Sequence, residues 1–203
     1  ETAGYIIVDT DIVDQYSGID AGTFTASQNY ESNPSNITFS ETFTNTPYVF
    51  TSVQTFTGPN PIETRVQSIT STGFIGGICE QNGIDTCSSS HGNETVGWIA
   101  IQPANEPFTI ENFDSGITNF NGGDNWNSLN FDTVFSEPPV VLAEVQENNG
   151  SQELMLDEVN NVTSTSLDVR FCELDGPDKC DGHMTNAVAY FAIDEGSFDP
   201  PEL

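Results

Sequence analysis

The residues best placed to do chemistry are four cysteines in two pairs. Seven residues separate Cys79 from Cys87, and seven separate Cys172 from Cys180. Cysteine pairs in zinc fingers and ribbons are usually only about two to four residues apart, whereas a gap of seven residues suits a hairpin loop closed by a disulfide. Because the spacing recurs, we predict the disulfides Cys79–Cys87 and Cys172–Cys180, which require an oxidising compartment.

A metal site is the alternative use of these cysteines. His91 follows the first pair by four residues, and His183 follows the second pair by three. Acidic residues add oxygen ligands that could hold calcium, although neither cluster has EF-hand spacing. The two clusters are Asp9, Asp11 and Asp14, and Asp175, Asp178 and Asp181. Because the cysteine gap is too long for a zinc site and the acidic clusters lack EF-hand spacing, we predict no cofactor or metal, with Ca²⁺ as the alternative.

Catalysis would need a nucleophile beside a base, or two carboxylates at a cleft. The chain has only two histidines, each tied to the same position after a cysteine pair, and no nucleophile-elbow or phosphate-loop motif. We expect a protein that is not an enzyme.

The sequence segments that position these residues form an internal repeat, because each occurs in two copies. Four residues recur 92 positions later: Phe39, Phe43, Pro47 and Val49 return as Phe131, Phe135, Pro139 and Val141. The apolar block 98–101 likewise returns as 190–193. A unit of about 90 residues has the size of a domain. The sequence therefore predicts an N-terminal extra strand or arm (1–11), a first domain (12–102), a linker (103–109) and a second domain (110–203).

Period-two alternation and runs of β-branched and aromatic residues predict an all-β chain, two tandem antiparallel β-sandwich domains of about six strands each. The predicted strands are 36–43, 48–56, 63–69, 73–79 and 95–101, then 129–135, 140–146, 153–159, 166–172 and 186–193. Two prolines should make the linker semi-rigid. The unduplicated segment 4–9 is expected to be a strand, which completes a sheet of its own domain or adds to a neighbouring molecule.

Acidic residues dominate the charge. The chain has 31 acids against three bases, Arg65, Arg170 and Lys179, and a net charge of −28. This charge repels phosphate and anionic lipid, so no nucleic acid is expected as a partner. No apolar run is long enough to span a bilayer, so no membrane insertion is expected. The chain begins at Glu1 without a basic, apolar leader, which predicts a processed form of a secreted, extracellular or cell-surface protein. Sequons mark four candidate glycosylation sites, Asn36, Asn93, Asn149 and Asn161.

Ordered blocks in both copies resemble the H-type lectin domain, the family of snail agglutinins and of the C-terminal domain of discoidins. In the first copy these blocks are 15–22, 36–39, 71–74 and 97–101, and in the second they are 115–117, 129–131, 137–141, 161–167 and 190–193. The resemblance implies a six-stranded antiparallel sandwich per copy and oligomers around a threefold axis. It also implies binding of galactose or N-acetylgalactosamine at clefts between neighbouring domains.

The family binds sugar through an arginine, an aromatic-histidine pair and an aspartate. In this chain the aromatic-histidine position falls on Gln81-Asn82 in the first copy and on Leu174-Asp175 in the second. The aspartate position falls near Gln28, with Asp124 as the candidate in the second copy, and Arg65 is the candidate arginine. Together with polar residues of the cysteine hairpins, the candidate carbohydrate-binding set is Gln28, Arg65, Glu80, Gln81, Asn82, Asp124, Glu173, Asp175 and His183.

Two functions follow from these expectations. The first is a secreted, lectin-like recognition or adhesion protein, with neutral glycans or glycoproteins as partners and with self-association. The alternative is a structural subunit of an extracellular filament, coat or matrix, built from lectin-like sandwiches whose sugar site has decayed.

Overall fold

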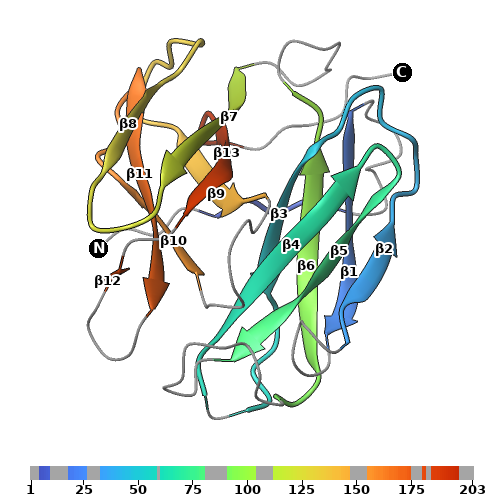
Figure 1. Cartoon of the computed structure of the whole chain (residues 1–203). Helices are drawn as coiled ribbons and strands as arrows, with labels where there is room; N and C mark the ends of the chain where they lie inside the picture. Colours follow the sequence, from blue (N-terminus) through green and yellow to red (C-terminus); the bar gives the residue numbers. More distant parts are fainter. Residues whose placement is uncertain are drawn as a thin grey trace.

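A computed structural model (Figure 1) describes residues 5–9, 18–26, 33–58, 60–80, 91–103, 112–146, 155–174, 180–181 and 184–196. Of residues 155–157, 173–174 and 180–181 it describes the backbone alone. Every helix or strand within these ranges is a β-strand, so the predicted all-β class is confirmed.

Two small antiparallel sheets form the first sandwich. One has the order β1-β6-β3 and the other β2-β5-β4. The bounds are β1 (Ile19–Ala26), β2 (Ser35–Thr38), β3 (Tyr48–Val53), β4 (Ile62–Thr70), β5 (Gly73–Glu80) and β6 (Glu94–Ile101).

Two further antiparallel sheets form the second sandwich. One has the order β7-β13-β9, and the other has the order β10-β11-β12 with β8 also paired to β11. The bounds are β7 (Phe113–Asn121), β8 (Asn127–Asn130), β9 (Val140–Val145), β10 (Met155–Asn160), β11 (Ser166–Leu174), β12 (Cys180–Asp181) and β13 (Thr185–Ile193). Each strand pairs only with strands of its own copy, which gives the two tandem sandwiches that the repeat predicted.

The two copies repeat individual contacts as well as strands. The backbone N–H of Phe39 donates to the carbonyl of Thr72 at 3.0 Å, and that of Phe131 donates to the carbonyl of Thr165 at 2.9 Å. The paired rings also repeat, because Phe39 meets Phe43 edge-on with ring centroids 5.0 Å apart, and Phe131 and Phe135 do the same at 5.2 Å. The repeated phenylalanines are therefore framework residues of each core.

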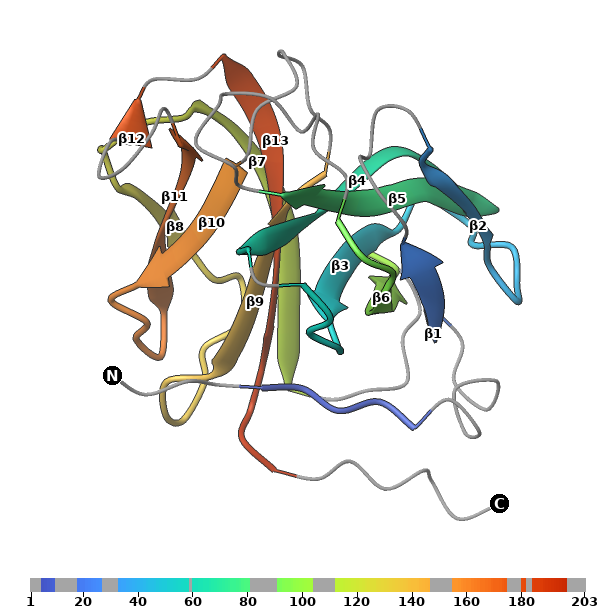
Figure 2. The same cartoon turned by 90° about the horizontal axis from the view of Figure 1, so that it is seen from below.

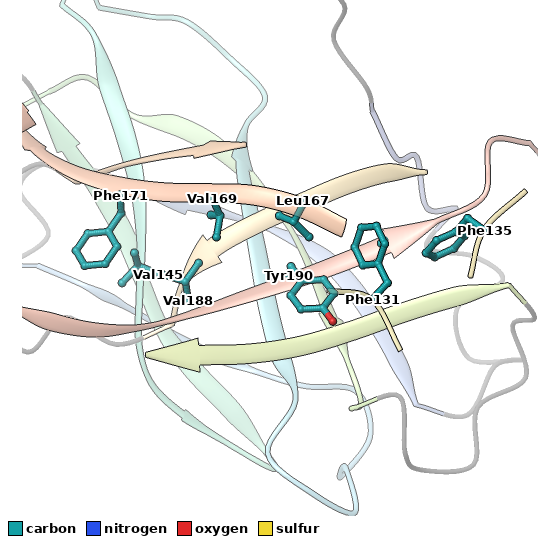
Figure 3. Close-up of a cluster of buried hydrophobic side chains, with 9 residues drawn as sticks. Phe131, Phe135, Val145, Leu167, Val169, Phe171, Val188 and Tyr190 are labelled. Atoms are coloured by element: carbon teal, nitrogen blue, oxygen red, sulfur yellow. The ribbon is translucent and has the colours of Figure 1, made fainter. Parts of the chain in front are cut away.

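Alternation along the strands fills each core. In the second sandwich, β11 contributes Leu167, Val169 and Phe171 to a cluster that also holds Val188 and Tyr190 of β13 (Figure 3). The equivalent cluster of the first sandwich is built from Phe39, Phe43, Val49, Val66, Phe74, Trp98 and Ala100.

Strand β13 is buried on both faces over residues 188–193, and the second face of β6 is half-buried at Ile99 and buried at Ile101. In β13, Val188, Tyr190 and Ala192 enter the sandwich core, whereas Ala189, Phe191 and Ile193 enter a separate cluster with Ile19, Phe50 and Ile101 of the first sandwich. A strand buried on both faces reads as a continuous apolar run. The closing blocks 98–101 and 190–193 are therefore continuous because their second face packs against the other sandwich.

Hydrogen bonds from β9 and the residue after it reinforce this junction between the sandwiches. The side-chain amide of Gln146 accepts from the backbone N–H of Val49 and donates to its carbonyl, both at 2.8 Å. The carboxylate of Glu144 accepts from the N–H of Thr51 at 2.9 Å and from its hydroxyl at 2.7 Å. These bonds satisfy outward backbone groups of β3, which is an edge strand of its sheet.

Several predicted strand limits were wrong. Strand β2 ends at Thr38 and β8 at Asn130, earlier than the predicted ends at Phe43 and Phe135. The backbone N–H groups of these phenylalanines donate to turn carbonyls of residues 71 and 164, and their rings turn into the core. Strands β1 and β7 were missed because glycine, threonine, serine and aspartate interrupt their apolar alternation.

Residues 5–9 form an extended arm and not the expected strand, since they pair with no strand in the described part of the chain. Ile6 and Val8 pack on the cluster between the sandwiches, while Tyr5 and Ile7 are exposed. Figure 2 shows the arm in dark blue along one edge of the molecule. The predicted linker lies outside the described residues except for Pro103.

Candidate functional site

A row of three side chains crosses the outer face of the second sandwich. Glu158 of β10 lies opposite Arg170 of β11, and Trp126 directly precedes β8 on the other side of β11. Because Val169 and Phe171 point into the core, alternation directs Arg170 away from it. We call Asp124, Trp126, Glu158, Asp168 and Arg170 the Trp126 face.

Arg170 is held on both sides. Its Nε and Nη2 donate to Oε2 of Glu158 at 2.8 and 2.7 Å. Its Nη1 donates to the backbone carbonyl of Asp124 at 3.4 Å and lies 4.0 Å from the Asp124 carboxylate. The guanidinium is therefore fixed in position by a strand neighbour and by the loop before β8.

Trp126 supplies an aromatic surface. The Cζ atom of Arg170 lies 4.5 Å from the centroid of its ring, which is a cation–π contact. Trp126 is nevertheless 38% exposed, and the Asp124 side chain beside it is 80% exposed. The contact with Arg170 orients the indole and leaves part of it open to a ligand.

Asp168 extends the polar part of this face. Its carboxylate accepts from the hydroxyl of Ser128 and from Nδ2 of Asn161, the latter at 2.7 Å. These hydrogen bonds lower the pKa of Asp168, and the bond from Ser128 has the larger effect. The Trp126 face carries three carboxylates and one guanidinium, so it disfavours an anionic ligand.

Of the residues predicted to bind sugar, the structure describes the side chains of Arg65, Glu80 and Asp124, and these three do not converge. Arg65 lies opposite Gly77 and Glu80 lies opposite Ile62, positions that alternation places on opposite faces of the β2-β5-β4 sheet. Arg65 is buried, and Glu80 is a buried acceptor for Nδ2 of Asn60 at 2.9 Å. Asp124 belongs to the other sandwich. Five predicted residues lie outside the described ranges, Gln28, Gln81, Asn82, Asp175 and His183, and of Glu173 only the backbone is described.

Four residues of the Trp126 face were missed by the sequence prediction: Trp126, Glu158, Asp168 and Arg170. The cysteine hairpins, where the prediction placed the polar sugar contacts, contain no aromatic residue, and the indole comes from the loop before β8. A usable signal was present, because Arg170 is one of three bases and alternates with the apolar Val169 and Phe171 in a predicted strand.

A second polar cluster surrounds Glu94 at the start of β6. Its buried carboxylate accepts from the hydroxyl of Thr55 at 2.5 Å and from the N–H of Thr57 at 2.6 Å, and Nδ1 of His91 lies 3.5 Å away. Burial alone would raise the pKa of Glu94. The hydrogen bonds from Thr55 and Thr57 and the charge of His91 outweigh burial and lower the pKa to about 2. The Glu94 carboxylate therefore stays ionised and holds the loop after β3.

Among the described side chains no cysteine is free, and Cys79 and Cys172 are disulfide-bonded. The side chains of Cys87 and Cys180 lie outside the description, so the predicted pairing stays a prediction. At the backbone level, β12 pairs Cys180 with Leu174, which brings it to the strand that carries Cys172.

Neither a metal site nor a membrane-spanning helix is found among the described residues. No group of three or more histidine, cysteine, aspartate or glutamate side chains in the described ranges could hold a metal ion. Nor do those ranges contain a helix long and apolar enough to cross a membrane. Of the candidate glycosylation sites, Asn36, Asn93 and Asn161 are exposed, and Asn149 lies outside the described residues.

Comparisons of the chain with protein-family models, with curated proteins and with solved structures find no match.

Proposed function

We propose that this protein is a carbohydrate-binding, lectin-like recognition or adhesion protein, and that the Trp126 face binds a neutral glycan. The observation that carries the proposal is a partly exposed indole, oriented by Arg170, beside the exposed Asp124 carboxylate. A neutral sugar presents an apolar C–H face that stacks on an aromatic ring and hydroxyl groups that donate to carboxylates.

Electrostatics favours a neutral glycan over an anionic one. Arg170 is already paired with Glu158 and adjacent to Asp124, so its charge is compensated. A sulfated or carboxylated sugar would meet the remaining carboxylates and the net charge of −28. The resemblance to H-type lectins supports a galactose-type sugar as the first ligand to test.

A secreted or cell-surface location is part of this proposal. It is supported by Cys79 and Cys172, which are disulfide-bonded, because disulfides persist in oxidising compartments. Non-reducing peptide mapping tests the proposed Cys79–Cys87 and Cys172–Cys180 pairs. A cross-copy pair such as Cys79–Cys172 would refute them.

A glycan array that contains neutral and anionic glycans tests the sugar proposal. We expect binding to neutral glycans, and we expect Trp126→Ala to weaken it by roughly 2 kcal/mol, about thirtyfold. The matched control is Val134→Ala, which removes an exposed apolar side chain of the same sandwich. A folded wild-type protein that binds no neutral glycan would overturn the proposal.

A structural subunit is the second candidate function. It is favoured by the arm, in which Tyr5 and Ile7 expose 77% and 83% of their surface and pair with no described strand. Exposed extended segments of this kind are templates for association between chains. Sedimentation at high protein concentration tests this function, and a chain that stays monomeric would exclude it.

A further inference from the structure

Phe56 is an exposed aromatic residue of the first sandwich. It lies in the loop after β3, in residues 54–58, which we call the Phe56 loop, and 71% of its surface is exposed. It belongs to none of the apolar clusters among the described residues. Core packing therefore does not explain an aromatic residue at this position.

The residues on both sides of Phe56 are clamped to Glu94. Oε2 of Glu94 accepts from the Thr55 hydroxyl at 2.5 Å, and Oε1 accepts from the N–H and the hydroxyl of Thr57 at 2.6 and 2.8 Å. The Thr55 hydroxyl also accepts from the N–H of Thr95 at 2.8 Å. Because both neighbours are held toward β6, the side chain between them is presented outward.

Two glycines complete the clamp. A Cβ atom on Gly58 would lie 2.2 Å from Nε2 of His91, and one on Gly92 would lie 3.0 Å from Oγ1 of Thr57. A side chain at Gly58 would therefore displace the His91 ring, and one at Gly92 would press tightly on Thr57. A buried carboxylate is costly unless it is fully hydrogen-bonded, as Glu94 is here. The result is a preorganised loop, and preorganisation lowers the cost of binding a ligand.

We propose that Phe56 is a second aromatic contact for a neutral glycan, located on the first sandwich. This inference rests on the proposed carbohydrate function. The ring offers a stacking surface, and the exposed side chains of Gln54 and Asn93 offer amide groups for sugar hydroxyls. The ionised Glu94 beneath the loop and the absence of any lysine or arginine in residues 52–58 and 91–95 disfavour an anionic ligand.

The junction between the sandwiches gives the two aromatic contacts a fixed spacing. Gln146 and Glu144 hydrogen-bond to Val49 and Thr51 of β3, the strand that leads into the Phe56 loop. Two sites held at a fixed spacing bind a glycan-coated surface more tightly than either site alone, provided that both can engage together. Where both contacts engage one surface, the first sandwich would add avidity to the Trp126 contact.

Calorimetric titration with a monovalent neutral oligosaccharide, chosen from the array, tests the inference. We expect two binding equivalents per chain in the wild type and one in Phe56→Ala or in Trp126→Ala. Phe56→Tyr, which keeps an aromatic ring, should retain both equivalents. On a glycan-coated surface, Phe56→Ala should lower the apparent affinity by at least about tenfold.

The outcomes separate this inference from the proposed function. One equivalent that Trp126→Ala abolishes and Phe56→Ala leaves unchanged would overturn the role of Phe56 and keep the Trp126 site. Glycan binding that is unchanged in Trp126→Ala would overturn the Trp126 site. Because Phe56 is exposed, its substitution should leave the far-UV circular dichroism spectrum unchanged, so that a loss of binding reports the contact itself.

Discussion

The junction between the sandwiches depends on Gln146, and we expect Gln146→Ala to be strongly destabilising. The Gln146 side chain is buried and bonds both the N–H and the carbonyl of Val49, a residue with no exposed surface. Truncation leaves two buried backbone groups without partners, each of which costs about 1 to 3 kcal/mol. Allowing for partial rescue by water, the free energy of unfolding should fall by roughly 2 to 4 kcal/mol.

The repeat provides a matched control at Gln54, the equivalent position of the first copy. The backbone N–H of Gln54 donates to Thr95 and that of Gln146 to Ala187, both at 2.8 Å, so the main chains correspond. The side chain of Gln54 is exposed and donates to the carbonyl of Ser52, two residues earlier, at 3.2 Å. Gln54→Ala should therefore cost less than about 0.5 kcal/mol.

Urea denaturation, followed by circular dichroism and by the fluorescence of the single tryptophan in each sandwich, measures both variants. The two signals should coincide in the wild type, because the junction couples the sandwiches. Equal losses of stability in Gln146→Ala and Gln54→Ala would refute the proposed role of the junction.

Two further predictions concern the first sandwich and the repeated cores. Because the pKa of Glu94 in the folded chain, about 2, lies below its ordinary value of 4.5, the stability it contributes is complete above pH 4.5 and is lost as the pH falls toward 2. Glu94→Gln should flatten the pH dependence of the melting temperature in this window, and an unchanged slope would contradict the buried clamp. Glu137→Gln, at an exposed position, is the control for the loss of one carboxylate. A Cβ atom on Gly22 would lie 2.9 Å from the Trp98 ring, and one on Gly116 would lie 2.7 Å from the Tyr190 ring. Gly22→Ala and Gly116→Ala should each cost about 1 to 3 kcal/mol in urea denaturation, and wild-type stability in either would show that the aromatic ring moves aside at no cost.

Much of the framework could be predicted from the repeat. Phe39, Phe43 and their partners 92 residues later occupy the same places in the two cores and make the same backbone hydrogen bonds. The junction also left a signal, since the blocks 98–101 and 190–193 are continuously apolar where a strand with one solvent-facing side would alternate. The hydrogen bonds of the junction could not be predicted from the sequence. Gln146 and Gln54 occupy equivalent positions of the repeat, and only their tertiary surroundings decide that Gln146 bonds across the junction.

The candidate site was less predictable. Asp124 was a sugar-binding candidate from the family resemblance and stays a prediction. The candidates Arg65 and Glu80 lie on opposite faces of one sheet. Trp126, Glu158 and Arg170 come from three separate segments, and only the pairing of β8, β10 and β11 places them in one row. Strand order is a non-local property, so residue types and local spacing did not reveal that row.

The most direct test of the account is ¹⁹F NMR of the protein labelled with 5-fluorotryptophan, during titration with a neutral glycan. The chain has two tryptophans, the buried Trp98 and the partly exposed Trp126, and the variant Trp126→Phe assigns their two resonances. We predict a saturable shift of the Trp126 resonance and an unchanged Trp98 resonance. A glycan that binds while the Trp126 resonance stays unchanged would contradict the account.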